Sequence, residues 1–218
     1  MLYAIIEGYT VIWCETEVLK YDKFFISFRG PGDLLGEIGI VSPNRHRVHI
    51  RATDDCTLIE LPPNILKART ESSIYQNLSA ILAKKIYLER LRSEVLSIPA
   101  GIRRVALTLY NLLSDDFRGS IPVHVTIRGT DYEGQRLKGT IRPRDIAGYV
   151  AATDRTVYRH LSRLEQNGLV HVSNGVITVL DAERLDLVSG DESILPKQQV
   201  QKKTVKGDTR APGTPASA

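Results

Sequence analysis

The stretch that most constrains the fold begins at Thr140 and reads TIRPRDIAGYVAATDRTVYRHLSRLEQNGLVHVSNGVITV. Thr140 is a candidate cap for a short helix that has Pro143 in its first turn and Asp145 near its N-terminus. The apolar face of this helix would consist of Ile146, Ala147 and Val150. A turn over residues 151–153 then leads to a second helix. The spacing predicts a helix-turn-helix.

The second helix is expected from about Asp154 to Asn167, where Gly168 ends it. Its inward positions, at steps of four and three, are Val157, Leu161 and Leu164. The residues predicted to meet DNA at its start are Thr153, Arg155, Thr156 and Arg159. Arginine can bond two acceptors on guanine, and threonine can contact a phosphate or a thymine methyl group. This face therefore suits the major groove.

A β-hairpin follows the second helix and supports this interpretation. Residues 169–173 and 176–179 are rich in β-formers and flank Asn174-Gly175, a pair typical of tight hairpin turns. The alternative is a helical hairpin with a merely charged face, and a following wing argues against it. We therefore predict a winged helix-turn-helix. Arg142, Arg144 and His160 would lie near the phosphates and add affinity without sequence information.

The first 65 residues predict short strands separated by turns. The expected strands are 2–6, 10–14, 23–28, 48–52 and 56–61. Pro31 and Gly32 lie in a turn over residues 29–33. Short strands at this spacing are typical of a barrel or jelly roll. After Pro62-Pro63 a short helix is expected over 64–68.

A long helix is expected from Ser72 or Ser73 to the residue before Pro99. Its apolar residues recur at steps of three, four or seven: Ile74, Leu78, Ile81, Leu88, Leu91, Val95 and Ile98. That spacing is typical of a helix packed along another helix. We favour a seam between two copies of the chain over packing on its own domain, because a small β domain covers less apolar surface than this helix offers.

The region between the long helix and Thr140 predicts a helix, a strand and a loop. The amphipathic helix would bury Ile102, Val105, Ala106, Leu109 and Leu112. Residues 120–128 alternate as a strand does, and 131–139 are expected to form a polar loop. From about Gly190 the chain is polar and rich in Lys, Pro and Thr, so we expect a disordered tail.

Composition excludes several classes of protein. No apolar run is long enough for a membrane span, and the first residues lack the basic segment of a secretory signal. Two cysteines, Cys14 and Cys56, cannot form a four-thiolate zinc or iron–sulfur site, so no metal site is expected and a cytoplasmic protein is the default. The net charge of +4 permits a polyanionic partner. Glu37 and His46 are not accompanied by a catalytic triad or phosphate loop, so no enzyme is expected.

Three motifs together resemble the cyclic AMP receptor/fumarate-nitrate regulator (CRP/FNR) family of bacterial transcription factors. They are PGDLLGEIGI at 31–40, RRVALTLYNLL at 103–113 and TDRTVYRHLSRLEQNGLV at 153–170. The resemblance implies an α+β fold with four parts: a cyclic-nucleotide-type β-roll over 1–70, a dimerisation helix over 71–98, a winged helix-turn-helix over 99–187, and the tail over 188–218. It also implies a homodimer that binds a pseudo-palindromic site on double-stranded DNA and contacts RNA polymerase.

The resemblance further implies an effector pocket in the roll. The positions that match it are Gly36, Glu37, Arg47, Val48, Glu89 and Arg90. In family members that bind a nucleotide, the Gly-Glu pair and a following Arg hold the ribose hydroxyl and cyclic phosphate, so cyclic AMP and cyclic GMP are candidate effectors. Val48 stands where a hydroxyl residue is usual, and Glu89-Arg90 stand where a Thr-Ser pair is usual. His46 occupies the Arg position in an alternative register, and His46 and His49 are the open candidates for a haem ligand.

The sequence departs from the usual pattern of the family at two places, its first residues and the start of the second helix. The chain starts at a segment that lies well inside the family's roll, which predicts a trimmed roll or an upstream start. Asp154 and Arg155 stand where Arg and Glu are usual, so the preferred half-site should differ from the common one. The alternatives to a ligand-gated regulator are a regulator with a vestigial pocket and a nucleotide-binding module that does not bind DNA.

Overall fold

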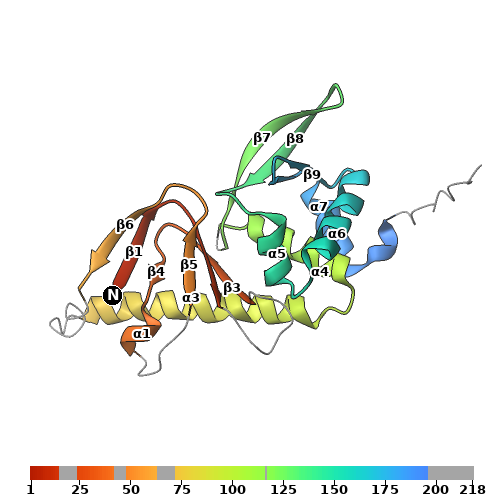
Figure 1. The fold of residues 1–218 in the computed structure, drawn as a ribbon. Helices are drawn as coiled ribbons and strands as arrows, with labels where there is room; N and C mark the ends of the chain where they lie inside the picture. The colour runs from red at the N-terminus through yellow and green to blue at the C-terminus, as the bar shows by residue number, and fades with distance from the viewer. Residues whose placement is uncertain (15–23, 42–47, 63–71, 116, 196–218) are drawn as a thin grey trace, which may run out of the picture.

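The computed structural model describes residues 1–14, 24–41, 48–62, 72–115 and 117–195. A small β region and a helical region with its own sheet lie side by side, and one long helix runs beneath the first toward the second (Figure 1). The predicted helix at 64–68 and the tail from residue 196 lie outside the described residues.

The β region is a roll of two three-stranded antiparallel sheets. Their strand orders are β4-β1-β6 and β3-β2-β5. The elements are β1 (Leu2–Glu7), β2 (Thr10–Cys14), β3 (Phe24–Arg29), β4 (Leu34–Leu35), α1 (Ile38–Val41), β5 (His49–Ala52) and β6 (Thr57–Leu61). The predicted turn forms at Gly32, where φ is +86° and the Asp33 N–H donates to the Gly30 carbonyl at 3.0 Å. The expected strands of the roll are thus confirmed.

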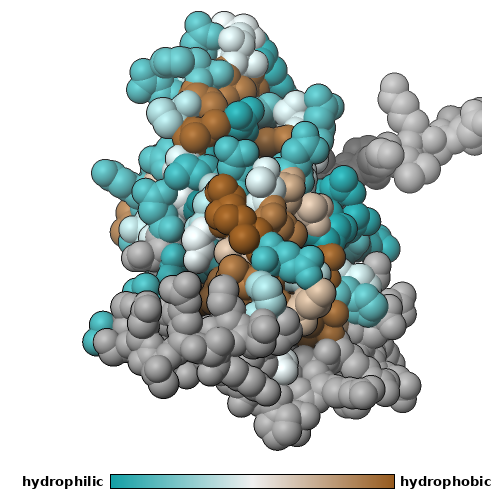
Figure 2. Space-filling model, turned by 90° about the vertical axis from the view of Figure 1, so that its left-hand side faces the viewer, coloured by the Kyte–Doolittle hydropathy of each residue, from teal (hydrophilic) through white to brown (hydrophobic). Residues whose placement is uncertain are grey.

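The roll buries some of its apolar side chains and exposes others. Leu2, Ile5 and Leu35 are buried, whereas Ile6, Leu58 and Ile59 are exposed. Figure 2 views the molecule from the side on which Figure 1 places β1 and β6, and apolar side chains gather in the middle of that view. The roll therefore has more apolar surface than its own core uses.

The long helix is α3 (Ser72–Ser97), which ends before Pro99 as predicted. Leu88 and Val95, which we assigned to a seam between two copies, are buried within the chain, because this face of α3 packs on the rest of the molecule. Our assignment of these two residues was wrong. The opposite face exposes Ile86 and Tyr87.

The C-terminal region combines helices with a four-stranded antiparallel sheet of order β7-β8-β10-β9. Its elements are α4 (Gly101–Leu113), β7 (Ser120–Ile127), β8 (Thr130–Leu137), α5 (Pro143–Tyr149), α6 (Asp154–Gln166), β9 (Val170–Ser173), β10 (Val176–Val179), α7 (Ala182–Gly190) and a 3-10 turn η1 (Glu192–Ile194). The five residues predicted to form the buried face of α4 are all buried.

Two parts of this region differ from the predictions. The expected polar loop at 131–139 is largely strand β8, which pairs with β7 through a tight turn at Arg128 and Gly129. Because β8 is mostly exposed, its polar composition hid the strand. The ordered chain also continues past residue 187, since Val188 and Leu195 are buried.

A continuous apolar cluster is centred on α4, α5 and α6. It includes Val95 from α3 and also Val11 and Phe28 from the roll. The β region and the helical region therefore share packed side chains. Across the described ranges, no helix combines the length and apolar character needed to cross a membrane.

Candidate DNA-binding face and effector pocket

The second helix of the predicted helix-turn-helix is α6, and its start and end are close to those predicted. Thr153 caps it, because its Oγ1 accepts a hydrogen bond from the Thr156 N–H at 3.2 Å. Its apolar side packs on α5. The six residues expected to face inward are all buried: Ile146, Ala147, Val150, Val157, Leu161 and Leu164. The remaining surface of α6 faces outward.

On that outward surface the two predicted arginines are exposed, whereas the two predicted threonines form hydrogen bonds at the helix cap. Arg155 and Arg159 are exposed. The hydroxyls of Thr153 and Thr156 lie 2.9 Å apart, so both take part in the cap. Tyr158 and Ser162 are also exposed on this face and were missed by sequence reasoning. Their spacing of three and seven residues from Arg155 was the available signal.

The first helix, α5, begins differently from the prediction. Its cap position is Arg142 rather than Thr140, and Pro143 is its first residue. The Asp145 carboxylate closes this end, because its Oδ2 accepts from the Arg142 N–H at 3.1 Å. The Arg142 and Arg144 side chains remain exposed. Both are thus available at the helix N-terminus, where a phosphate is favoured.

His160 does not share the exposed position of the arginines. It is half-buried and its Nε2 lies against Gly101 at the start of α4, where a Cβ would meet the ring. Burial lowers the pKa of His160 below its usual value, and Arg159 and Arg163 lower it further. A half-buried imidazole with a lowered pKa is less suited to a phosphate contact than the exposed Arg142 and Arg144.

The predicted wing is present. β9 and β10 pair through Asn174 and Gly175, whose φ angles of +50° and +77° suit a tight hairpin turn. Glu165 of α6 anchors the hairpin, because its Oε1 accepts from the Val172 N–H at 3.0 Å and lies 2.9 Å from His171 Nδ1. The wing is thereby fixed relative to α6.

In the roll, the predicted Gly-Glu pair forms a close contact with α3. Gly36 has a φ of +88°, and a Cβ at this position would meet the Met1 carbonyl. Glu37 is 5% exposed, and its Oε1 lies 2.6 Å from the Nζ of Lys85, which is 8% exposed. The same Nζ donates to the Leu34 carbonyl at 2.6 Å. Burial lowers the pKa of Lys85, and Glu37 opposes that shift.

Among the described residues, no hydrogen bond or ion pair joins Val48, Glu89 or Arg90 to Glu37. Arg47 lies outside the described residues, and Val48 is exposed. Glu89 is half-buried, and burial raises its pKa while Arg92, 3.9 Å away, opposes the rise. Arg90 lies on the opposite, exposed side of α3 and pairs with Glu94 at 3.1 Å.

Lys85 and Arg92 are the inward-facing charges that sequence reasoning missed. The apolar series on α3 steps by seven from Ile81 to Leu88, and the inward position that it skips is Lys85. Arg92 directly follows Leu91 of the series, so no gap marked it. Both cations are buried, and the one gap was the signal of Lys85.

Within the described ranges, no three His, Cys, Asp or Glu side chains are grouped so that they could hold a metal ion. Cys14 and Cys56 are free thiols, and both are partly buried. A groove of about 410 Å³ lies between α3 and α4 and is walled by Tyr87, Tyr110 and Phe117. None of the predicted effector residues lines it.

Comparisons with known proteins agree with this arrangement. Residues 103–188 match the Crp-like helix-turn-helix domain. Electron transport regulator A of Shewanella oneidensis is 24% identical over 195 residues, which cover 88% of this chain and 72% of that protein. Cyclic AMP receptor protein of Thermus thermophilus is 25% identical over 166 residues, which cover 75% and 68%. The solved structure of a CRP/FNR-family transcriptional regulator, also from Thermus thermophilus, superposes with a TM-score of 0.65 at 19% identity and covers 87% of each chain.

The fold and the matched domain define a transcription regulator with a helix-turn-helix for DNA. The curated relatives and the shared architecture narrow the likeness further: the chain is similar to regulators of the CRP/FNR family.

Proposed function

We propose that the chain acts as a homodimer that reads a pseudo-palindromic promoter site with α6. The observation that carries this proposal is the outward face of α6, where Arg155 and Arg159 are exposed beside a firmly anchored wing. Arg155 would read guanine, and Arg142 and Arg144 would position the duplex through its phosphates. Tyr158 joins the reading face as a further contact.

Self-association is proposed through the exposed side of α3. Ile86 is 72% exposed and Tyr87 is also exposed, on a helix whose opposite side is already covered by the chain itself. Large apolar side chains on such a surface favour burial against a second copy. Two copies related by a two-fold axis along α3 would present two α6 helices to two half-sites. Contact with RNA polymerase is proposed from the family relationship alone.

This proposal assigns a separate role to each of three segments of the chain. The roll over 1–70 would sense, α3 would dimerise, and the region from residue 99 would bind DNA. The buried Val188 and Leu195 extend this last unit to residue 195.

The DNA proposal is tested by Arg155→Ala and Arg159→Ala against a duplex selected from a random library. Each substitution should weaken binding by about 1–3 kcal/mol, and Arg155→Ala should relax the preference at one base position. Arg184→Ala removes the same charge from the exposed surface of α7 and serves as the control. If all three variants bind alike, the assignment of α6 is wrong.

The roll is proposed to be either a small-molecule sensor or a pocket that has lost its effector, and one observation favours the second. The Glu37 carboxylate, expected to bind a ligand hydroxyl, is already paired with Lys85 at 2.6 Å. A ligand such as cyclic AMP or cyclic GMP would have to share or displace that contact, which costs binding free energy.

Calorimetric titration with cyclic AMP and cyclic GMP separates the two candidates. Heat of binding in the parent protein that disappears in Glu37→Gln identifies a sensor. Absence of heat in both proteins, together with unchanged DNA affinity, identifies a ligand-independent regulator. Absence of DNA binding with heat present would instead identify a nucleotide-binding module.

A further inference from the structure

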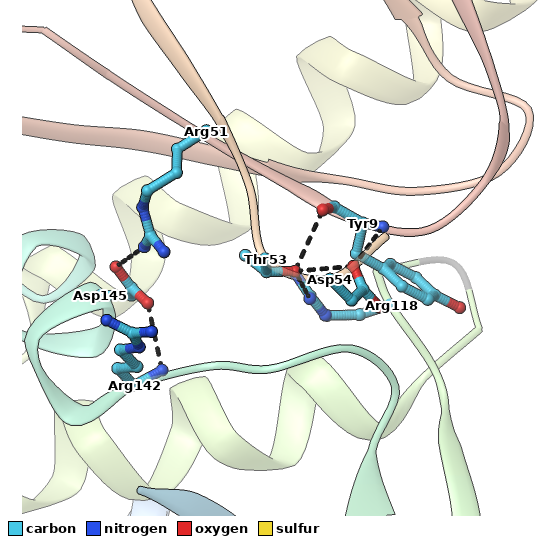
Figure 3. A network of polar contacts seen from close by, with 7 residues as sticks. All are labelled: Tyr9, Arg51, Thr53, Asp54, Arg118, Arg142 and Asp145. Carbon is cyan, nitrogen blue, oxygen red and sulfur yellow. Dashed lines mark hydrogen bonds and ion pairs between the residues drawn. The ribbon is translucent and has the colours of Figure 1, made fainter. Parts of the chain in front are cut away.

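The roll is joined to the first helix of the helix-turn-helix by a network of polar contacts (Figure 3). Arg51 of β5 donates from Nη2 to Asp145 Oδ1 at 2.7 Å. The other oxygen of Asp145 caps α5 through the Arg142 N–H. One buried carboxylate thus closes the start of α5 and ties it to a strand of the roll.

A second contact crosses the same interface in the opposite direction. Arg118 follows α4, is 4% exposed, and donates from Nη2 to Thr53 Oγ1 at 2.9 Å. Its Nε bonds the Lys138 carbonyl, and its guanidinium lies over the Tyr9 ring at 4.6 Å. Stacking of a desolvated guanidinium on an aromatic ring adds to the hydrogen bonds. The contact joins the helical region to the roll.

The roll side of this contact is itself held in place. Thr53 bonds the Tyr9 carbonyl through both its N–H and its hydroxyl, at 2.8 and 3.0 Å, and the Tyr9 N–H donates to Asp54 at 2.8 Å. Gly139, with a φ of +66°, lies so close that a Cβ would meet both Arg118 and Tyr9. The close approach of the two regions thus requires glycine at this position.

The other end of α5 is fixed by packing. Tyr149 lies against Phe28 of β3 with ring centroids 5.6 Å apart, and Arg92 of α3 donates to the Tyr149 carbonyl at 3.3 Å. Both aromatic residues are 2% exposed. With Asp145 held near its start, α5 is attached to the roll at both ends and to α3 at its second end.

These contacts leave the proposed DNA face open. Arg142, Arg144, Arg155 and Arg159 are all exposed while the regions are docked. The interface therefore does not block α6 but sets its direction relative to α3. Polar groups with directional bonds, such as a carboxylate shared between two donors, select one orientation more strongly than apolar contacts do.

We propose that Arg51, Thr53, Arg118 and Asp145 form a latch that fixes α5, and with it α6, relative to the α3 helix. The latch makes the spacing of two recognition helices depend on the roll, since Arg51 and Thr53 belong to the roll. The attachment of α5 to the roll is inferred from the contacts alone. The effect of the latch on DNA binding rests on the proposed function.

The latch is tested with Arg51→Gln, Asp145→Asn and the double variant Arg51→Gln/Arg118→Gln. Asparagine keeps an oxygen for the α5 cap, and Arg51 is partly exposed, so the single variants should fold; circular dichroism checks this. Arg136→Gln, on the exposed surface of β8, is the matched control for loss of one positive charge.

The first readout needs no DNA. Hydroxyl-radical labelling detected by mass spectrometry should rise at Tyr149 in the three latch variants, most in the double variant, because the docked roll covers this residue. Leu109, buried inside the helical region, should stay unlabelled and reports an intact fold. Labelling at Tyr149 equal to that of the parent protein in all three variants would overturn the latch.

The second readout is affinity for a selected duplex with two half-sites and for the same duplex with one. We expect the latch variants to lose about tenfold on two half-sites and less than twofold on one. Equal losses on both duplexes would overturn the role in spacing. If the parent protein binds neither duplex, the proposed function fails, and the labelling result alone decides the latch.

Discussion

In the winged helix-turn-helix the charged side chains lie mostly on the surface, whereas in the contact between the roll and α3 several lie inside. Leu109, Ile146, Leu161 and Leu164 pack together without a polar partner. By contrast, Glu37 and Lys85 meet at 2.6 Å in a buried contact. Apolar packing tolerates little change in shape, while a buried ion pair depends on both partners. A substitution should therefore act through lost packing in the first region and through lost charge in the second.

The largest effect is expected from breaking the buried pair on one side. Glu37→Leu leaves Lys85 charged and without its carboxylate, so the free energy of unfolding should fall by about 3–5 kcal/mol. Urea denaturation measures the change. Adding Lys85→Met to Glu37→Leu should recover most of the loss, because two apolar groups need no partner. A double variant as unstable as the single one would contradict a role for charge.

A comparable but slightly smaller loss is expected in the apolar region. Leu109→Ala leaves a cavity in the centre of the cluster and should lower the free energy of unfolding by about 3 kcal/mol. The control is Leu187→Ala on the exposed side of α7, which should change stability by less than about 0.5 kcal/mol. Adding Lys85→Met should restore stability to Glu37→Leu but not to Leu109→Ala.

A gain is expected at the turn between the two helices. Ala151 has a φ of +52°, a conformation that costs a residue with a Cβ about 1–2 kcal/mol. Ala151→Gly removes this strain and should raise the midpoint of thermal unfolding. Ala152→Gly, one residue later, is the matched control and should lower it, since glycine there only adds freedom to the unfolded chain. Equal responses would show that backbone strain is not involved.

The smallest effect is a dependence on pH. Burial lowers the pKa of His160, so the unfolded chain binds more protons than the folded one just below pH 6.5. Stability should therefore decrease as the pH falls through this window and be unaffected by His160 above it. Urea denaturation at about pH 7.5 and about pH 5.5 measures the difference. His160→Gln should reduce it, whereas replacement of the exposed His124 should leave it in place.

Much of the fold could be predicted because its signals are local. The wing follows from Asn174-Gly175, and α6 follows from its apolar steps and the capping Thr153. β8 was missed because an exposed hairpin strand needs no apolar residues, so alternation is lost. The cap of α5 was misplaced because the carboxylate of Asp145, three residues after Arg142, closes the helix start in place of the Thr140 hydroxyl.

The candidate sites were harder to predict wherever they depend on partners far apart in the chain. The face of α6 could be read from one helix, whereas Lys85 of α3 meets Glu37 in the roll, and Arg51 meets Asp145 at a separation of 94 positions. A single sequence gives the charge of such residues but not their neighbours. The gap between Ile81 and Leu88 in the apolar series of α3 pointed to Lys85, and nothing comparable marked Arg51, Arg92 or Arg118.

The shared apolar cluster has a consequence for how the molecule comes apart. Val11 and Phe28 of the roll pack into the same interior as Leu109 and Leu161. Neither region can open without exposing surface of the other, so heat should melt the described structure in one cooperative transition rather than domain by domain. Because the closing contacts join residues so distant in the sequence, we also expect slow refolding, with the roll and the helical region reaching their native state together.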